Sequence, residues 1–336
     1  MSRAPVSVVI TTYNRRHLVC DAIDSVLAQS RPAAEIIVID DGGKDDTGDA
    51  LRAYGDKIRY VYQENAGLSA ARNHGIRLAT QPFVAFLDDD DVWHPRKLEF
   101  QMPVLERDPE MGMIGAEQFD WPVATFPNIP ADAARSLVPV SWERLVIRTL
   151  IPVSSAIIRR TVLDHIGGFD MSGLLFGSED RDMFLRVAEV ARVAMFDVAL
   201  IGYRDTIGSM CKKPLAREQA MREILRRLDE RKVWSGRWLL RHKAYSQLLI
   251  NCSDAQARAG NHAGAVRRTL NSLAWYPLPY RRGETRMPLE RPRRLAVNVL
   301  RLLKLKRPDA MAAKATPTTN ALIEMRHRMA DTAPSH

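Results

Sequence analysis

The sequence predicts an α/β protein whose N-terminal part is a Rossmann-like parallel sheet with helices on both faces. Short Ile- and Val-rich runs alternate with segments of helical periodicity from residue 6 to residue 87. These runs are apolar throughout, as is typical of parallel strands covered by helices on both sides. Three of them end in polar clusters, and ligands of such sheets bind outside the carboxyl ends of the strands. We therefore expect a ligand crevice at that edge.

The expected elements follow one another without long interruptions. Glycine and acidic residues separate the apolar runs, and each helical segment repeats its apolar residues every three or four positions. Strands are expected at residues 6–12, 35–41, 58–64 and 83–87, with helices at 18–30, 46–54 and 68–79.

Composition is that of a globular protein. Of 336 residues, 46% are apolar and 26% are charged. No apolar run approaches the length of about 18 residues that a membrane span needs, and the first strand follows Pro5 without a signal-peptide core. We expect a cytoplasmic protein. The cysteines Cys20, Cys211 and Cys252 lack metal-site spacing and are expected to be reduced.

Positive charge is concentrated in one segment. The net charge is +9, and residues 281–307 contain ten Lys or Arg residues against two acidic ones. Residues 308–336 sum to zero, so the first 280 residues are close to neutral. An anionic partner would therefore meet residues 281–307, and the main domain gives no indication of nucleic-acid binding.

The stretch FVAFLDDDDVWHPRKLEF places four consecutive aspartates behind a buried strand. One interpretation is a solvated acidic turn that caps the helix starting near Pro95. The other is a cation site, because clustered carboxylates need a positive charge and suit a hard divalent ion. The first strand ends in TTYN instead of GxGxxG, which argues against a dehydrogenase, and GGKDDT has Asp45 where a phosphate-binding loop needs Ser or Thr.

Four blocks in succession resemble the family 2 glycosyltransferases of the GT-A fold. They are VSVVITTYNRRHLVCDAIDSVLAQ, IIVIDDGGKDDT, NAGLSAARNHGI and FVAFLDDDDVWHPRKLE, and the resemblance extends over residues 6–203. It implies a GT-A catalytic domain, a nucleotide-sugar donor, a divalent metal (Mn²⁺ or Mg²⁺) and inversion at the anomeric carbon.

The resemblance also implies roles for residues at the donor side. Thr11 and Tyr13 would hold the nucleotide, with the Tyr ring near the base. Asp41 would accept a hydrogen bond from the base edge. Arg72 would lie near the diphosphate, where a guanidinium suits phosphate oxygens.

The acidic block of the family, D-x-D-D-x-W-x-P, aligns its acids with Asp88, Asp90 and Asp91. By resemblance, Asp90 is the metal ligand, and Asp88 contacts the ribose or reaches the metal through water. Asp89 occupies a variable position and is counted with the donor-binding residues. Because the block contains one carboxylate more than the family pattern, the position of the metal ligand is ambiguous by one residue.

A later block, FDMSGLLFGSEDRDMF, resembles the ED block of the family. This likeness assigns Asp180 as the base that takes the acceptor proton, with Glu179 beside it in acceptor or sugar contact. The alternative is that Ser178, Glu179 and Asp180 only cap the following helix and favour its dipole.

The C-terminal third is predicted to be helical. Two helices meeting at Gly260-Asn261 are similar to one tetratricopeptide hairpin, which we expect to pack on the catalytic domain. An earlier helix has an apolar stripe of Met221, Ile224, Leu225 and Leu228. The expected division is a catalytic domain at 1–210, a helical region at 211–307 and a disordered tail at 308–336.

Residues 291–307 form a basic amphipathic segment. Leu295, Val299, Leu302 and Leu303 can share one helix face, with arginines and lysines around it. Such a pattern is found in interfacial helices on anionic lipid and in ordinary docking helices, and both remain open. Lipid contact would place the protein peripherally on the inner face of the cytoplasmic membrane.

The combined prediction is a metal-dependent inverting glycosyltransferase. It would move a hexose-type sugar from a UDP-, GDP- or dTDP-linked donor to a saccharide or lipid-linked saccharide, in bacterial surface polysaccharide or glycoconjugate biosynthesis. One alternative is a non-catalytic nucleotide-binding protein of the same fold. A sugar-phosphate nucleotidyltransferase is a further alternative, disfavoured because no glycine-rich loop follows the first strand.

Overall fold

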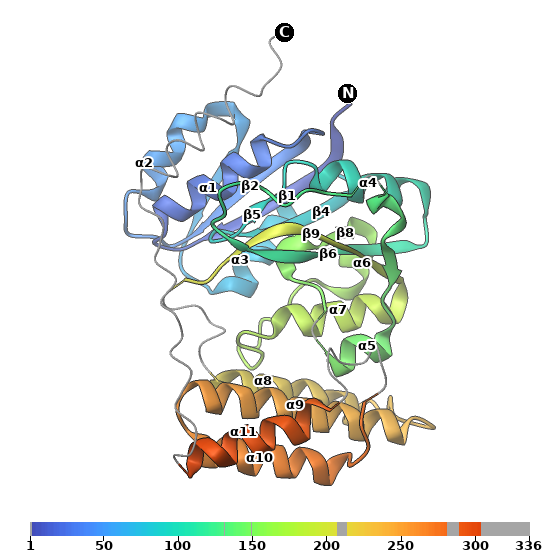
Figure 1. Cartoon of the computed structure of the whole chain (residues 1–336). Helices are drawn as coiled ribbons and strands as arrows, with labels where there is room; N and C mark the ends of the chain where they lie inside the picture. Colours follow the sequence, from blue (N-terminus) through green and yellow to red (C-terminus); the bar gives the residue numbers. More distant parts are fainter. Residues whose placement is uncertain (1, 131, 149, 207–213, 281–288, 304–336) are drawn as a thin grey trace.

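The computed structural model describes residues 2–130, 132–148, 150–206, 214–280 and 289–303. Within these residues a nine-stranded sheet lies above a layer of C-terminal helices in Figure 1. None of the described helices is both long enough and apolar enough to span a bilayer.

The first half of the sheet is parallel, as predicted. Its strand order is β3-β2-β1-β4, with bounds Arg59–Gln63 for β3, Ala33–Asp41 for β2, Ala4–Thr12 for β1 and Phe83–Asp88 for β4. The connecting helices are α1 (Arg16–Leu27), α2 (Thr47–Leu51) and α3 (Leu68–Leu78). The register pairs Thr11 with Asp88 and Thr12 with Asp40, so the three polar clusters start at one edge.

The second half of the sheet is mixed, which the sequence pattern does not predict. The short strand β8 (Ile157–Arg159) pairs antiparallel with both β4 and β6 (Met111–Trp121). Strand β9 (Arg192–Arg204) runs parallel to β6. The remaining strands are β5 (Val92–Trp93) and β7 (Leu137–Pro139), and both pair antiparallel with β9.

Helices cover both faces of the sheet, as predicted. Val8 and Ile10 of β1 pack on one side against α1 and α4 (Lys97–Arg107). Val9, between them, points to the other side, where α3 and α7 (Glu179–Val190) contribute to a second core. This alternation follows from the two-residue period of a strand. Two short helices, α5 (Trp142–Ile147) and α6 (Arg160–Ile166), lie before α7 in the chain.

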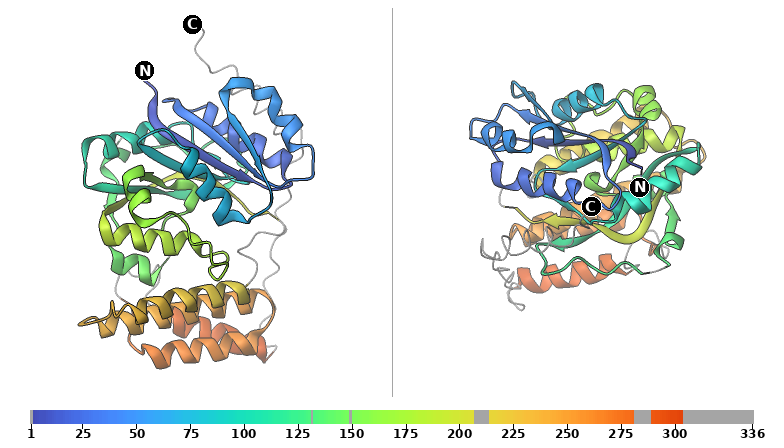
Figure 2. Two further views of the ribbon diagram at one scale, coloured as in Figure 1. Left: turned by 180° about the vertical axis from the view of Figure 1, so that it is seen from behind. Right: turned by 90° about the horizontal axis from the view of Figure 1, so that it is seen from above.

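Four helices make up the C-terminal layer seen from two sides in Figures 1 and 2. They are α8 (Pro214–Glu230), α9 (Trp238–Arg258), α10 (His262–Trp275) and α11 (Glu290–Leu302). The predicted stripe of α8 is buried and joins the core that includes α7. Helices α9 and α10 form the predicted hairpin, and Gly260 supplies the positive φ of +77° at its turn.

Helix α11 differs from its predicted arrangement. Arg291 and Asn298 are buried against the neighbouring helices, whereas Leu302 and Leu303 are exposed. Of the residues predicted to share one apolar face, Leu295 and Val299 are half-buried, whereas Leu302 and Leu303 stay exposed, so burial of α11 centres on its polar residues. The reason is that the Arg291 guanidinium binds the carbonyls of Tyr276 and Leu278 and so sets the rotation of the helix. Residues 304–307 and the predicted tail at 308–336 lie outside the described residues.

Candidate active site

The end of β1 carries the first polar cluster of the site. Thr11 is buried beside Asp88 of the neighbouring strand, whereas the Tyr13 side chain is 47% exposed. Asn14 adopts a positive φ of 53°, where the chain turns from β1 toward α1. Its Oδ1 atom accepts a hydrogen bond from the Lys44 backbone amide at 2.6 Å, which ties the first polar loop to the second.

Asp41 at the end of β2 is held by the loop that precedes α3. Its Oδ1 atom accepts hydrogen bonds from the Ala66 amide at 2.9 Å and from Gln63 Nε2 at 2.7 Å. Its Oδ2 atom accepts one from the Gly67 amide at 2.9 Å. Because each carboxylate oxygen has two lone pairs, Oδ2 retains capacity for one further donor.

The four aspartates of the acidic loop have separate environments. Asp91 is buried, where its carboxylate accepts hydrogen bonds from Ser154 Oγ at 2.6 Å and from the Arg204 amide at 3.3 Å. Loss of hydration raises the pKa of Asp91 well above its usual value. Asp91 therefore anchors the loop. Asp89 is buried as well, and the partly exposed aspartates of the loop are Asp88 and Asp90.

Arg15 binds two of these aspartates at once. Its Nη1 atom lies 3.0 Å from Asp89 Oδ1 and 3.0 Å from Asp90 Oδ2. Asp90 also accepts a hydrogen bond from Thr206 Oγ1 at 2.9 Å. Burial raises the pKa of Asp89 to about 7, and the guanidinium opposes that rise. Sequence reasoning did not identify Arg15, because no motif specifies a contact across 74 residues.

Arg72 joins the acidic loop to α7. Its side chain is 3% exposed, with Nη2 2.5 Å from Asp88 and Nη1 3.2 Å from Glu179. The guanidinium also lies 5.1 Å from the ring centroid of Phe169. Arg72 was predicted to lie near a diphosphate. In the structure it fixes one carboxylate from each side of the site.

Asp180 lies half-buried in the first turn of α7. Burial and the adjacent Glu179 charge raise the pKa of Asp180 to about 6, against the opposing effect of Arg72. Its Oδ1 atom accepts a hydrogen bond from the Arg181 amide at 2.7 Å. Ser178, at the N-cap, makes no side-chain capping bond, and Glu179 is directed to Arg72. The ion pair with Arg72 disfavours a purely capping role for Glu179.

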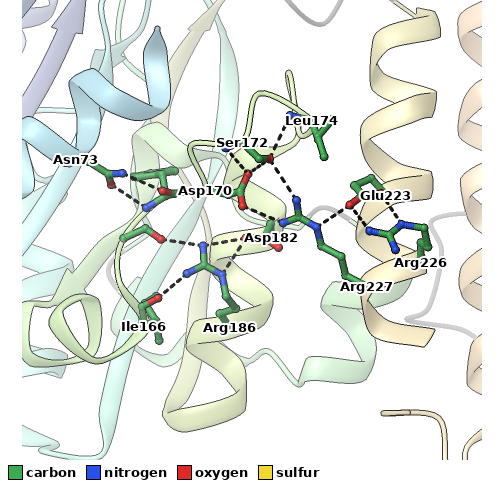
Figure 3. Close-up of polar contacts among 12 residues, drawn as sticks. Asn73, Ile166, Asp170, Ser172, Leu174, Asp182, Arg186, Glu223, Arg226 and Arg227 are labelled. Carbon is green, nitrogen blue, oxygen red and sulfur yellow. Dashed lines mark hydrogen bonds and ion pairs between the residues drawn. The ribbon is translucent and has the colours of Figure 1, made fainter. Parts of the chain in front are cut away.

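The loop before Asp180 is fastened by three helices, as Figure 3 shows. Asn73 of α3 exchanges hydrogen bonds of 2.9 and 2.8 Å with the Phe169 backbone. Arg186 of α7 donates to the Ile166 and Gly168 carbonyls at 2.8 Å each. Arg227 of α8 binds Asp170 at 2.9 Å. The C-terminal layer therefore helps to shape this side of the site.

Sequence comparison places the chain in a family. The model of "Glycosyl transferase family 2" matches residues 7–127. The uncharacterized glycosyltransferase RP339 of Rickettsia prowazekii is 30% identical over 236 residues, which cover 69% of this chain and 70% of that protein. The chain belongs to glycosyltransferase family 2.

Other relatives of this family 2 chain match shorter parts. The putative teichuronic acid biosynthesis glycosyltransferase TuaG of Bacillus subtilis is 44% identical over 101 residues, 29% of this chain and 40% of TuaG. An uncharacterized glycosyltransferase of Rickettsia felis is 32% identical over 205 residues, 59% of this chain, but the match spans only 34% of that protein.

Solved structures show that the family 2 chain has the GT-A fold. S. aureus TarS 1–349 in complex with UDP-GlcNAc aligns with a TM-score of 0.55 and 18% identity, covering 84% of this chain and 93% of TarS 1–349. The mannosyltransferase PcManGT of Pyrobaculum calidifontis, in complex with GDP-Man and Mn²⁺, aligns with a TM-score of 0.57 and 20% identity. That alignment covers 91% of this chain and 89% of PcManGT.

Proposed function

We propose that this family 2 glycosyltransferase moves a sugar from a nucleotide-diphosphate donor to an acceptor hydroxyl, with inversion at the anomeric carbon. The observation that carries the proposal is the Arg72 bridge, which links Asp88 at 2.5 Å and Glu179 at 3.2 Å. Asp88 is the last residue of the donor-side strand β4, and Glu179 precedes Asp180 on α7. A leaving diphosphate and an acceptor base would then lie on opposite sides of one crevice.

The donor would bind at the ends of β1, β2 and β4. The exposed Tyr13 ring offers a stacking surface for the base, next to Thr11. The remaining acceptor capacity of Asp41 Oδ2 suits an N–H of the base edge. TarS and PcManGT bind UDP-GlcNAc and GDP-Man, which supports a UDP-, GDP- or dTDP-sugar here. Asp88 and Asp89 would complete the donor side.

The acidic loop fits a divalent cation that is shared with the donor. No three His, Cys, Asp or Glu side chains converge into a ready-made metal site among the described residues. A cation on a diphosphate needs only one or two protein carboxylates, because phosphate oxygens and water complete its ligands. Arg15 already places positive charge against Asp90 at 3.0 Å. We therefore assign Asp90 as the protein ligand of Mn²⁺ or Mg²⁺, with Asp88 close by.

The residues of the chain would divide the chemistry as follows. Asp180 accepts the proton of the acceptor hydroxyl as that oxygen attacks the face opposite the diphosphate. Glu179, held by Arg72, contacts the acceptor or the transferred sugar. A bound metal would neutralise the charge that develops on the leaving diphosphate. Kinship with TuaG supports a saccharide or lipid-linked saccharide of the bacterial surface as acceptor.

Calorimetric titration with nucleotides tests the donor assignment. UDP, GDP and dTDP are each titrated with and without Mn²⁺ or Mg²⁺, and we expect one of them to bind, more tightly with metal. That nucleotide then identifies the donor sugars to screen for transfer. A nucleotide affinity that is the same with and without metal would contradict the assignment of Asp90 as metal ligand. No binding of any nucleotide would contradict the donor site and favour a non-catalytic protein.

Replacing Arg15 by Gln should strengthen Mn²⁺ binding in the absence of nucleotide. A metal must displace the guanidinium from Asp90, and Arg15 is one-third exposed, so the competing ion pair contributes about 1 kcal/mol. We expect the dissociation constant for Mn²⁺ to fall about fivefold, measured by electron paramagnetic resonance of free Mn²⁺. Arg16→Gln is the matched control, because Arg16 pairs with the exposed Asp46 instead. Unchanged or weaker Mn²⁺ binding in Arg15→Gln would contradict the competition.

A further inference from the structure

Helix α11 buries its polar residues. Arg291 is 2% exposed and Asn298 is 4% exposed, seven positions apart on one helix face. Arg291 donates to Ser246 Oγ at 3.0 Å and to the carbonyls of Tyr276 and Leu278, and its guanidinium stacks on Tyr280. These bonds compensate the buried charge and fix which face of α11 turns outward.

The outward face of α11 is apolar. Leu289 is 68% exposed, Leu300 is 41% exposed and Leu303 is 60% exposed. Pro292 and Ala296, which lie between them, are also exposed, so apolar residues recur every three or four positions along the side away from Arg291. One exposed leucine is ordinary, but a continuous stripe indicates a surface that is covered by a partner.

Helix α10 lies next to this surface and also exposes apolar residues. It packs beside α11, exposes Leu270 at 50%, and leads to Leu278, which is 59% exposed. Figures 1 and 2 place both helices at the end of the molecule remote from the sheet. The sequence of α10 contains no acidic residue, but three of the six arginines of α10 and α11 are already engaged: Arg268 pairs with Glu218, Arg294 pairs with Asp254 and Glu290, and Arg291 is buried against backbone carbonyls. Arg267 and Arg293 are exposed there.

We propose that the α10–α11 face, defined by Leu270, Leu278, Leu289, Leu300 and Leu303 with Arg267 and Arg293, binds the surface of an anionic lipid bilayer. Leucines that enter the acyl boundary beside arginines that meet anionic headgroups are the combination that interfacial helices use. The charge of the exposed Arg267 and Arg293 favours one of the two occupants that the face could have. A second copy of the same face would bring like charges together, whereas an anionic bilayer would neutralise them.

This surface also bears on the acceptor, in a step that rests on the proposed function. The helical layer that includes α10 and α11 contacts the loop before Asp180 through Arg227 and Asp170, 2.9 Å apart. If the acceptor is lipid-linked, binding through the α10–α11 face would keep the enzyme on the membrane that carries the acceptor. The vesicle measurement below needs neither donor nor transfer, so its outcome is independent of the proposed reaction.

Vesicle co-sedimentation tests the proposal. The full chain is mixed with phosphatidylcholine vesicles, with or without phosphatidylglycerol. We expect binding to the anionic vesicles, weakened by added salt. The partition coefficient onto anionic vesicles should be at least about tenfold lower for the double variant Leu300→Ser/Leu303→Ser than for the wild type. The variant Arg267→Glu should show a loss of the same order. These side chains are exposed, so circular dichroism and melting temperature should match those of the wild type.

Two controls make the result decisive. Leu27→Ser changes a leucine that is 37% exposed on α1, away from the proposed face, and should bind anionic vesicles like the wild type. Sedimentation velocity without lipid should show a monomer. A dimer that the paired leucine variant dissociates would overturn the proposal in favour of self-association. Equal binding of wild type and Leu300→Ser/Leu303→Ser would overturn it as well.

Discussion

Replacing Asp180 by Asn should lower kcat by about 10² to 10⁴, because an amide cannot take the acceptor proton. The replacement keeps the shape of the side chain, so the affinity for the donor nucleotide should change little. Turnover of a screened nucleotide sugar and calorimetry with the free nucleotide measure the two effects separately. Transfer at the wild-type rate would show that Asp180 is not the base.

The pH dependence of kcat/KM in the wild type is a second test of Asp180 as the base. Burial and the Glu179 charge raise the pKa of Asp180 to about 6. The base must be ionised to accept a proton, so kcat/KM should fall as pH drops below about 6 and level off above it. Asp164→Asn, which changes a well exposed aspartate of α6, should keep both the rate and this profile. The range from pH 5 to pH 7 spans about one unit on either side of this pKa. A kcat/KM that stays constant over that range would contradict the assignment of Asp180 as the base.

Replacing Arg72 by Met should destabilise the protein by about 3 to 5 kcal/mol, the usual effect of removing one partner from a buried ion pair. The side chain of Glu179 is only 9% exposed and would remain without its counter-charge. The Asp88 side chain is 30% exposed, so water can partly replace the guanidinium there. Urea unfolding, followed by circular dichroism, gives the free energy of unfolding of each variant.

A double-mutant cycle shows whether the ion pair is responsible. In a Glu179→Gln background no buried charge is stranded, so Arg72→Met should destabilise the protein less than it does in the wild type. Arg72→Lys keeps the charge but not the two-pronged geometry, and should be intermediate. Equal losses in both backgrounds would assign the effect to packing against Phe169 instead.

Much of the sheet could be predicted because its determinants are local. The runs before Thr12, Asp41 and Asp88 are rich in buried Ile, Val and Phe and end in polar residues. Such runs can pair only as buried strands, and parallel pairing brings their ends together. The α9–α10 hairpin was equally predictable, because helical periodicity on both sides meets Gly260.

The other features depend on contacts between distant segments. Strand β8 is three residues long, too short to show a period, and its direction is set by pairing with β4 and β6. Arg15 and Arg72 bind carboxylates that lie 16 to 107 residues away in the sequence. The rotation of α11 follows from the carbonyls that Arg291 meets near Tyr276. A helical wheel contains no information about those carbonyls.

The Arg72 bridge implies that the two halves of the site are linked thermodynamically. One guanidinium carries a single positive charge, yet it lies against both Asp88 and Glu179, with Asp180 as an additional neighbour. A cation that binds Asp88 weakens the attraction between Asp88 and Arg72. Arg72 then interacts more strongly with the acids of α7, which favours the ionised form of Asp180. By reciprocity, an ionised Asp180 competes with Asp88 for Arg72 and makes Asp88 a stronger attractor of cations. Occupancy of the donor site and the ionised fraction of Asp180 would thus rise together. This coupling favours an order in which the donor binds before the acceptor.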